Sequence, residues 1–188
     1  MRLLVAGGAG FIGSNFIHYM LDKYPDYEII NFDALTYAGN LDNLETVQDN
    51  PHYHFEEGNI TDLTRVNEVI EKHKITHLIN FAAETHVDKS IHGGIKDFVL
   101  TNSLGVQMLL DATRINKLTR MVNVSTDEVY GSLGAEGKFT ETTPYAPNSP
   151  YSASKASSDH FVRAYHHTYG FPTLTTNCSN NYGPFQFP

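Results

Sequence analysis

The N-terminal stretch RLLVAGGAGFIG, residues 2–13, decides the fold of this 188-residue chain. Its apolar run Leu3–Ala6 has the composition of a buried β-strand, and the segment Phe11–Lys23 that follows has the length and pattern of a helix. Glycines lie between them, so the chain can turn sharply from strand to helix. A strand, a glycine-rich turn and a helix in this order predict the first unit of a parallel α/β sheet.

The glycines of this turn are spaced as in dinucleotide-binding proteins. Gly7, Gly10 and Gly13 satisfy G-x-x-G-x-x-G, and Gly8, Gly10 and Gly13 satisfy G-x-G-x-x-G. Backbone without Cβ atoms can approach a pyrophosphate closely, and the N-terminus of the following helix favours its negative charge. The alternative is that the glycines serve only a tight turn, and the next carboxylate along the chain weighs against it.

That carboxylate is Asp33, about 20 residues beyond Gly13 at the end of the apolar run Glu28–Phe32. A carboxylate in this position can hold the hydroxyls of an adenosine ribose. A 2′-phosphate about 4 Å away would be repelled by roughly 4 kcal/mol per charge pair at an effective dielectric constant of about 20. Residues 34–40 contain no arginine to reverse this preference. We therefore expect NAD, rather than NADP, as the cofactor.

Apolar runs and longer helical patterns alternate along the rest of the chain, without a repeat or a low-complexity tract. The expected strands are Leu3–Ala6, Glu28–Phe32, Tyr53–Glu57, His77–Phe81, Arg120–Val124 and Thr173–Asn177, and the expected helices are Phe11–Lys23, Asp62–His73, Ile95–Asn116 and Tyr151–Tyr169. Near-continuous apolar strands are typical of sheets buried on both faces. The prediction is an α/β fold: a Rossmann-like, doubly wound parallel sheet with helices on both faces, forming one NAD-binding domain over residues 1–188.

Composition and charge narrow the function classes. The net charge of -8, with Lys and Arg scattered, argues against nucleic acid or an anionic membrane surface as a partner. No apolar run is long enough to span a bilayer. The only cysteine, Cys178, allows no intramolecular disulfide, so a reducing cytoplasmic setting is expected. The ten histidines lack metal-ligand spacing, and no metal site is expected.

Two Tyr/Lys pairs with a four-residue spacing are candidates for acid–base chemistry, because a nearby ammonium favours phenolate and lowers the Tyr pKa. Tyr19 and Lys23 lie two turns into the first helix. Tyr151 and Lys155 open a helix just after a loop of about 20 residues that leaves the strand Arg120–Val124, and loops of this length are usually functional. Ligands bind outside the carboxyl ends of such strands. We therefore predict Tyr151 and Lys155 as catalytic and Tyr19 and Lys23 as a surface pair.

A triplet of polar residues, Thr126, Asp127 and Glu128, also follows the strand Arg120–Val124. A hydroxyl and two carboxylates in the ligand crevice would supply one hydrogen-bond partner, one acid and one base. Adjacent carboxylates raise at least one pKa, which would keep one of them protonated near neutrality. The same residue types also favour turn starts and N-caps. Spacing alone does not decide between a catalytic triplet and a turn cluster.

Together these motifs resemble the bacterial dTDP-glucose 4,6-dehydratases, a family of extended short-chain dehydrogenases/reductases. The similarity spans essentially the whole chain. The segments that carry it are Gly7–Gly13, Phe32–Asn40, Ala82–Asp88, Ser125–Gly131, Tyr151–Lys155 and Asn177–Pro184. The glycine and Tyr/Lys motifs are shared with epimerases, decarboxylases and reductases, whereas the Thr-Asp-Glu triplet is the element that distinguishes the dehydratases.

The resemblance implies a role for each residue of the site. Tyr151, supported by Lys155 and Thr126, would take the proton from the glucose 4-hydroxyl while the C4 hydride passes to NAD. Glu128 would then remove the C5 proton, and Asp127 would protonate the departing 6-hydroxyl. Return of the hydride to C6 would give the 4-keto-6-deoxy sugar and regenerate NAD.

The resemblance also implies which residues contact the ligands. Those implied for NAD are Gly7, Gly10, Phe11, Ile12, Gly13, Asp33, Asn59, Ile60, Ala82, Ala83, Thr101, Tyr151, Lys155 and Asn181, and those implied for the substrate are Thr85, Thr126 and Asn180. Two positions depart from the family pattern. Ala6 stands where Thr is frequent, and Asn59 stands where Asp usually contacts adenine. The Asn59 amide oxygen can still accept a hydrogen bond, without charge assistance.

Family members continue into a smaller C-terminal domain that grips the nucleotide, and this sequence does not include it. Residues 181–188 are expected to begin the connection to that domain, so the chain alone is expected to bind NAD without necessarily turning over substrate. Two long helices, Ile95–Asn116 and Tyr151–Tyr169, pair across a two-fold axis in this superfamily. The resemblance therefore implies a homodimer acting on a nucleotide-sugar.

Two alternatives stay open at this point. The chain is another sugar-nucleotide enzyme, either a 4-epimerase or a UDP-glucuronate decarboxylase, or it is a truncated NAD-binding module without turnover. Only the dehydratase loses water from its substrate, so the products distinguish the enzymes. The intact set Thr126, Asp127, Glu128, Tyr151 and Lys155 argues against a decayed relative.

Overall fold

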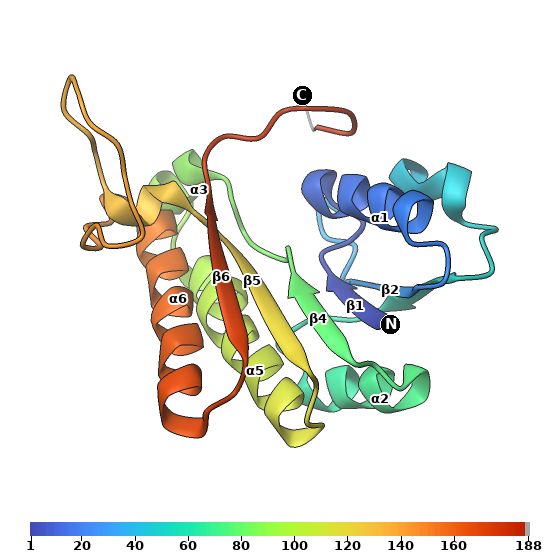
Figure 1. The fold of residues 1–188 in the computed structure, drawn as a ribbon. Helices are drawn as coiled ribbons and strands as arrows, with labels where there is room; N and C mark the ends of the chain where they lie inside the picture. Colours follow the sequence, from blue (N-terminus) through green and yellow to red (C-terminus); the bar gives the residue numbers. More distant parts are fainter. Residues whose placement is uncertain (187–188) are drawn as a thin grey trace.

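The computed structural model describes residues 1–186 and contains a six-stranded sheet in which every pair of neighbours is parallel (Figure 1). The strands are β1 (Arg2–Ala6), β2 (Glu28–Asp33), β3 (Tyr53–Glu57), β4 (His77–Asn80), β5 (Arg120–Thr126) and β6 (Thr173–Cys178). Their order in the sheet is β3-β2-β1-β4-β5-β6. The chain builds outward from β1 to β3, crosses back to β4 and builds outward in the other direction. This is the predicted doubly wound Rossmann-like topology, with its switch point between β1 and β4.

Helices cover the two faces unequally. They are α1 (Phe11–Lys23), α2 (Leu63–His73), α3 (Val87–His92), α4 (Lys96–Phe98), α5 (Val106–Ile115) and α6 (Pro150–Tyr169), with 3₁₀ turns η1 (Leu41–Val47) and η3 (Asp127–Tyr130) and a π-helical segment η2 (Val99–Gly105). On one face α1 and η1 pack on β1 and β2, burying Val5 and Ile29 of the strands against Ile17 of α1. On the other face, α2, α5 and α6 pack across the sheet.

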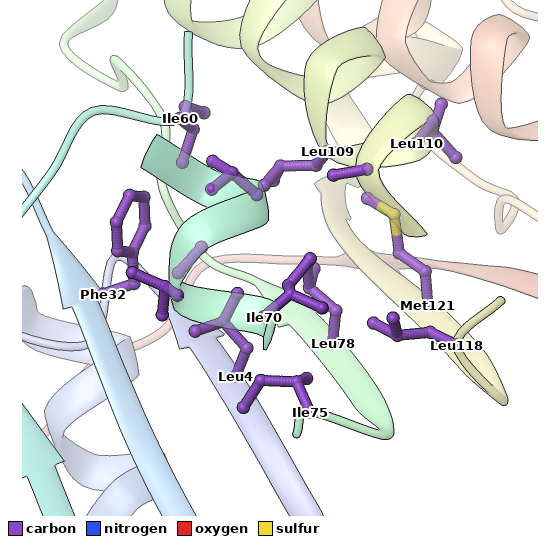
Figure 2. Close-up of a cluster of buried hydrophobic side chains, with 14 of the residues drawn as sticks. Leu4, Phe32, Ile60, Ile70, Ile75, Leu78, Leu109, Leu110, Leu118 and Met121 are labelled. Atoms are coloured by element: carbon purple, nitrogen blue, oxygen red, sulfur yellow. The ribbon is translucent and has the colours of Figure 1, made fainter. Parts of the chain in front are cut away.

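The larger core lies on this second face (Figure 2). Leu4, Leu78 and Met121 project from three successive strands and meet Ile70 of α2 and Leu109 of α5. Leu4 and Leu109 are fully buried, whereas Leu3 and Val5 point to the opposite face. Alternate residues of one strand thus reach two different cores, which explains the uninterrupted apolar composition of these strands.

The face of β5 and β6 opposite α6 is open within residues 1–186. Leu174 of β6 is 50% exposed and Thr176 beside it is also exposed. The prediction of helices on both faces therefore holds for β1 and β2, but only one face of the β5 and β6 half is covered by the described residues.

Three local elements were not expected. η1 and α3 lie in stretches predicted as loops, and the predicted single helix Ile95–Asn116 is divided into α4, η2 and α5. The π-helical turns of η2 are wider than α-helical turns and change which side chains face the sheet. A Cβ on Gly105, at the end of η2, would lie 2.5 Å from the Ile60 side chain, so this helix packs unusually close to the segment after β3.

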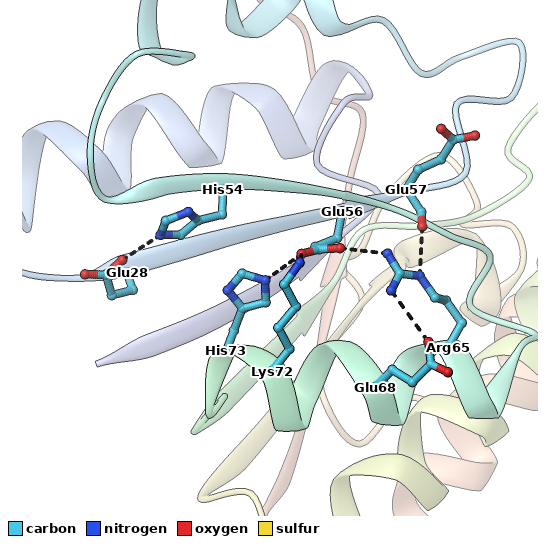
Figure 3. Close-up of polar contacts among 8 residues, drawn as sticks. All are labelled: Glu28, His54, Glu56, Glu57, Arg65, Glu68, Lys72 and His73. Atoms are coloured by element: carbon cyan, nitrogen blue, oxygen red, sulfur yellow. Dashed lines mark hydrogen bonds and ion pairs between the residues drawn. The ribbon is translucent and has the colours of Figure 1, made fainter.

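A charged network ties the edge strand β3 to α2 (Figure 3). The buried Glu56 carboxylate lies 2.7 Å from Arg65, 2.6 Å from Lys72 and 2.6 Å from His73. Burial alone would raise the pKa of Glu56, but hydrogen bonds from His73, Lys72 and Arg65 outweigh it and lower the pKa to about 2. Glu56 is therefore held ionised.

No helix within residues 1–186 is both long and apolar enough to cross a membrane.

Candidate active site at the carboxyl ends of the strands

Two cavities lie at the carboxyl ends of the strands, where ligands bind in doubly wound sheets. Ala83 and Phe81, just after β4, line both. Of the residues named from the sequence, the first cavity brings together Gly7, Gly10, Asp33, Asn59, Ile60, Ala82, Ala83 and Thr101. The second, of about 380 Å³, brings together Phe11, Ile12, Ala83, Thr85, Thr126, Glu128, Tyr151, Lys155, Asn180 and Asn181. Gly13 and Asp127 are not among the described residues lining either cavity.

Two glycines of the turn, Gly7 and Gly13, are packed too closely against backbone for side chains. Gly7 has φ +75°, and a Cβ there would lie 2.4 Å from the backbone nitrogen of Ala82. A Cβ on Gly13 would lie 2.2 Å from the Gly7 carbonyl oxygen, so Gly13 serves the contact of α1 with the turn rather than the cavity wall. Gly10 has nothing nearer than 3.5 Å and lines the cavity at the start of α1. The turn therefore leaves bare backbone beside a helix N-terminus, which suits a phosphate group.

Asp33 ends β2 and faces this turn. Its carboxylate accepts hydrogen bonds of 2.9 Å from the backbone amides of Ala9 and Leu35, and the residue is buried. The two bonds use one lone pair on each oxygen and leave others available on the cavity side. Asn59, in the segment after β3, and Thr101 of η2 line the same cavity.

The start of α6 positions Tyr151. Pro150 is the first helical residue, and Ser149 and Ser152 form a reciprocal capping box that satisfies backbone donors of the first turn. The amide of Tyr151 donates to the Ser90 hydroxyl of α3 at 3.3 Å. The unexpected helix α3 therefore acts as a second anchor for the start of α6.

The expectation that the pKa of Tyr151 is lowered was wrong. The side chain is 7% exposed, and burial together with the Glu128 charge raises its pKa to about 12, although the Thr126 hydroxyl opposes the rise. The Lys155 ammonium is directed elsewhere: it donates to the Val124 carbonyl at 2.7 Å. Helical spacing alone did not show that the cation would be held by β5 instead of by the phenol.

Lys155 is itself buried, at 4% exposure. Burial lowers the pKa of this ammonium to about 8, and the Asp159 carboxylate opposes that change. A group with this pKa carries its positive charge through most of the neutral range but loses it at mildly alkaline pH. The charge that favours phenolate is consequently pH-sensitive.

The Thr-Asp-Glu triplet is both a turn and a set of cavity side chains. Thr126 caps η3, where its hydroxyl accepts from the Glu128 amide at 3.2 Å, as a turn cluster would. Glu128 lines the second cavity with Thr126 and Tyr151. Burial and the adjacent Asp127 charge raise the pKa of Glu128. Asp127 is half-buried beside Thr126, whose hydroxyl lies 3.5 Å from its carboxylate.

Sequence reasoning missed two buried polar residues around the site. Asn102 of η2 accepts from the Glu84 amide and donates to the Glu84 carbonyl, both at 2.9 Å, and donates to Ser154 of α6 at 2.9 Å. It thus fixes the cavity wall after β4 to the helix that carries Tyr151. Asp159, one turn beyond Lys155, is 4% exposed. For Asn102 the available signal was a polar residue among the apolar positions Phe98, Val106 and Leu109, whereas the buried face of α6 is largely polar and gave no such signal for Asp159.

The alternative Tyr/Lys pair is a surface pair, as predicted. Tyr19 is 51% exposed and its hydroxyl accepts a hydrogen bond from the Lys23 ammonium. His166 and His167 are exposed near the end of α6. None of these four residues lines either cavity described above.

Comparison with known proteins finds similar chains among enzymes named for sugar-nucleotide substrates. It is 54% identical over 194 residues to dTDP-glucose 4,6-dehydratase of Xanthomonas campestris pv. campestris strain B100, covering 98% of this chain and 54% of that protein. The crystal structure of dTDP-glucose 4,6-dehydratase from Bacillus anthracis in complex with NAD is 53% identical, with a TM-score of 0.93 over 100% of this chain and 57% of that one.

A UDP-glucose 4-epimerase from Thermus thermophilus in complex with NAD is also similar, at 32% identity and a TM-score of 0.91 over 100% of this chain and 58% of that one. The chain spans about half the length of the curated relatives it matches. Residues 4–188 match the family model described as GDP-mannose 4,6 dehydratase. With nearly the whole chain matched and relatives at about half identity, this protein belongs to the GDP-mannose 4,6-dehydratase family.

Proposed function

We propose that this chain carries the cofactor-binding and catalytic residues of a dTDP-glucose 4,6-dehydratase. The observation that carries the proposal is the second cavity, where Tyr151, Lys155, Thr126 and Glu128 line one space beside the glycine turn. These are the acid–base groups that an internal oxidation followed by loss of water requires. Relatives named dTDP-glucose 4,6-dehydratase, at 47–54% identity, support the same choice of reaction.

NAD is the proposed cofactor, and the residues present fit it. The bare backbone at Gly7 and Gly10 suits the pyrophosphate, and the Asp33 carboxylate, at the end of β2, suits the adenosine ribose. Asn59 and Ile60 would contact adenine. Asn181, Phe11 and Ile12 line the second cavity, toward the reactive end. Bound in its oxidised form, NAD would supply the two-electron oxidant and a positive ring charge that favours phenolate at Tyr151.

Each protein group then has one proton to move or hold. Tyr151 takes the proton from the sugar 4-hydroxyl, with Thr126 donating to its oxygen and Lys155 supplying positive charge. Oxidation at C4 makes the C5 proton acidic, and Glu128 removes it. Asp127 donates a proton to the departing 6-hydroxyl as water leaves, and Glu128 returns its proton to C5 when the hydride is added at C6. Thr85 and Asn180, on the same cavity wall, are proposed to hold the substrate.

A homodimer is proposed from the outer faces of η2 and α6. Val99, Leu100, Leu104 and Phe161 are large apolar side chains that are 43%, 37%, 38% and 38% exposed. The two elements lie side by side, because the hydroxyls of Ser103 and Ser157 are 2.5 Å apart (Figure 1). Exposed apolar residues on adjacent helices favour burial against another copy. A cytoplasmic setting is proposed with the dimer, since the single Cys178 needs no oxidising compartment.

The 4-epimerase is the second candidate, because a UDP-glucose 4-epimerase has the same fold at 32% identity. Product analysis separates the two. The protein at its natural full length, incubated with dTDP-glucose and NAD, should release a 4-keto-6-deoxy sugar nucleotide that has lost one water. A product of unchanged mass with inverted C4 would contradict the dehydratase and support the epimerase. Binding of NAD without any product would support a module without turnover.

A further inference from the structure

Buried polar side chains connected by hydrogen bonds lie beneath the second cavity. They extend from β4 across β5 and end at Asp159 of α6. Asn80 of β4 and Asn123 of β5 are paired neighbours in the sheet, and both are fully buried. Asn123, together with Ser125 and Asn177, directs a donor at the Asp159 carboxylate. Such side chains are costly inside a strand core unless every hydrogen bond is made, so their presence calls for a role.

The direction of the hydrogen bonds is fixed at one end by a backbone amide. Ala82 N–H donates to Asn80 Oδ1 at 3.1 Å, so the Asn80 amide must present its NH₂ to Asn123. Asn80 Nδ2 donates to Asn123 Oδ1 at 3.0 Å, and Asn123 Nδ2 in turn approaches Asp159 Oδ1 at 3.4 Å. A group that can only donate therefore faces this oxygen of Asp159.

A backbone carbonyl fixes the direction at the other end. Asn177 Nδ2 donates to the Thr126 carbonyl at 3.2 Å, and Asn177 Oδ1 accepts from the Tyr130 hydroxyl at 3.3 Å. The same Nδ2 also donates to Asp159 Oδ2 at 3.2 Å. Ser125 and Tyr145 add hydroxyl donors to this oxygen at 2.8 and 3.1 Å. Burial raises the pKa of Asp159, but Ser125, Tyr145 and Asn177 donate to one carboxylate oxygen and Asn123 donates to the other, and these donors favour the ionised form.

We propose that Asp159 is the positioning residue of this site: its ionised carboxylate provides the buried counter-charge that keeps Lys155 an ammonium and locks α6 to the ends of β5 and β6. Lys155 and Asp159 are four residues apart on one face of α6 and both are 4% exposed. Lys155 donates to the Val124 carbonyl of β5, the strand that also carries the donors Asn123 and Ser125 to Asp159. One carboxylate therefore serves both the charge and the position of Lys155.

Within residues 1–186, the Asp159 carboxylate of α6 and the Cys178 thiol of β6 act on the charge of Lys155. Tyr151 and Glu128 line the same cavity as Lys155. Burial lowers the pKa of Lys155 to about 8 despite the opposing effect of Asp159. Without the Asp159 charge the pKa should fall further, and Lys155 would be neutral at neutral pH. The expected charge state of Lys155 does not depend on the proposed function. Only its kinetic consequence rests on that function, namely that activity is lost at alkaline pH.

The test is an NMR titration of the Lys155 side chain in protein labelled at lysine Nζ and Cε, with NAD added. In the unmodified protein Lys155 should titrate near pH 8, and Asp159→Asn should lower that midpoint by about one to three units. Asp111→Asn is the matched control, because Asp111 of α5 also accepts a tyrosine hydroxyl of α6, Tyr165, at 2.9 Å. It should leave the Lys155 midpoint unchanged. An unchanged midpoint in Asp159→Asn would overturn the proposal.

A reciprocal measurement covers the case in which Asp159→Asn does not fold. Lys155→Met, which also identifies the Lys155 resonance, should raise the Asp159 midpoint by the same number of units, since the coupling between two groups is mutual. An Asp159 midpoint that does not move in Lys155→Met would equally overturn the proposal. Neither titration involves turnover. If the midpoints move as expected but dTDP-glucose is not dehydrated, the proposed function fails while this inference stands.

Discussion

The backbone amide of Ala9 donates a 2.9 Å hydrogen bond to the carboxylate of Asp33. The glycine turn after β1 and the end of β2 are therefore joined at the cavity by a charge-assisted bond, which is stronger than a bond between neutral groups. The carboxylate is thereby held at the place where an adenosine ribose would lie, with no arginine in residues 34–40 to neutralise it.

Cofactor choice follows from that carboxylate. We expect the protein to bind NAD at least about 100-fold more tightly than NADP, because repulsion of a 2′-phosphate is worth roughly 4 kcal/mol before screening. Asp33→Asn should reduce this ratio, whereas Asp42→Asn, an exposed carboxylate of η1, should not. Calorimetric titration of cofactor-free protein measures both affinities. Equal affinities in the unmodified protein would contradict the role of Asp33.

The stability of the fold should depend on the Glu56 network at acid pH. The pKa of Glu56 is lowered from 4.5 to about 2, so its stabilisation is present above pH 4.5 and is lost as the pH falls from 4.5 toward 2. Glu56→Gln should lower the free energy of unfolding by about 3 kcal/mol at pH 7 and by much less near pH 2. Urea unfolding at several pH values measures this.

The control for this prediction is Glu57→Gln, one residue further along β3, where the side chain is exposed and directed away from the network (Figure 3). It should change the free energy of unfolding by less than about 0.5 kcal/mol. If Glu56→Gln is no more destabilising at pH 7 than Glu57→Gln, the network contributes nothing to stability.

Much of this architecture was predictable because its signals are local. The glycine turn, Asp33 and the capped start of α6 are contiguous segments, and each confers a geometry that depends little on the rest of the chain. The doubly wound parallel sheet was expected from the alternation of strands and helices, although the order of its strands comes from the structure. The Tyr19 and Lys23 pair was separated from Tyr151 and Lys155 by the same topological reasoning.

The features that were not predicted depend on contacts between distant segments. The π-helical segment η2 ends at Gly105, which packs closely against Ile60, 45 residues earlier in the sequence. The raised pKa of Tyr151 depends on burial and on Glu128, and the position of the Lys155 ammonium depends on a carbonyl of β5. Asp159 accepts hydrogen bonds from two strands, β5 and β6, and from Tyr145 in the loop before α6. None of these distances can be obtained from spacing along the sequence.

Assembly is a prediction about exposed apolar side chains. The protein at its natural full length should be a homodimer at micromolar concentration, and Phe161→Glu, which places a charge in the proposed interface, should weaken it. Leu174→Glu on β6 is the control, since Leu174 is also apolar and exposed but lies away from η2. Light scattering measures the mass. A monomeric mass for the unmodified protein, or dissociation only by Leu174→Glu, would contradict the proposed interface.

The roles of Tyr151 and Glu128 should separate in single-turnover experiments with dTDP-glucose. Tyr151→Phe removes the group that accepts the 4-hydroxyl proton, so no absorbance of reduced cofactor should develop. Glu128→Gln leaves that first step intact, so reduced cofactor and a 4-keto-glucose intermediate should accumulate while turnover falls by about 10² to 10⁴. Stopped-flow absorbance distinguishes the two variants. Reduced cofactor forming at the unmodified rate in Tyr151→Phe would assign the C4 proton to another base.

Exchange of solvent deuterium into C5 tests the assignment of the carboxylates most directly, because it requires a base at C5 and does not require loss of water. In deuterium oxide, Asp127→Asn should keep exchange at C5 while slowing dehydration, and Glu128→Gln should abolish exchange. Mass spectrometry of recovered sugar nucleotide measures both. If Glu128→Gln incorporates deuterium at C5 as fast as the unmodified protein, the C5 base lies elsewhere and the account of this site is wrong.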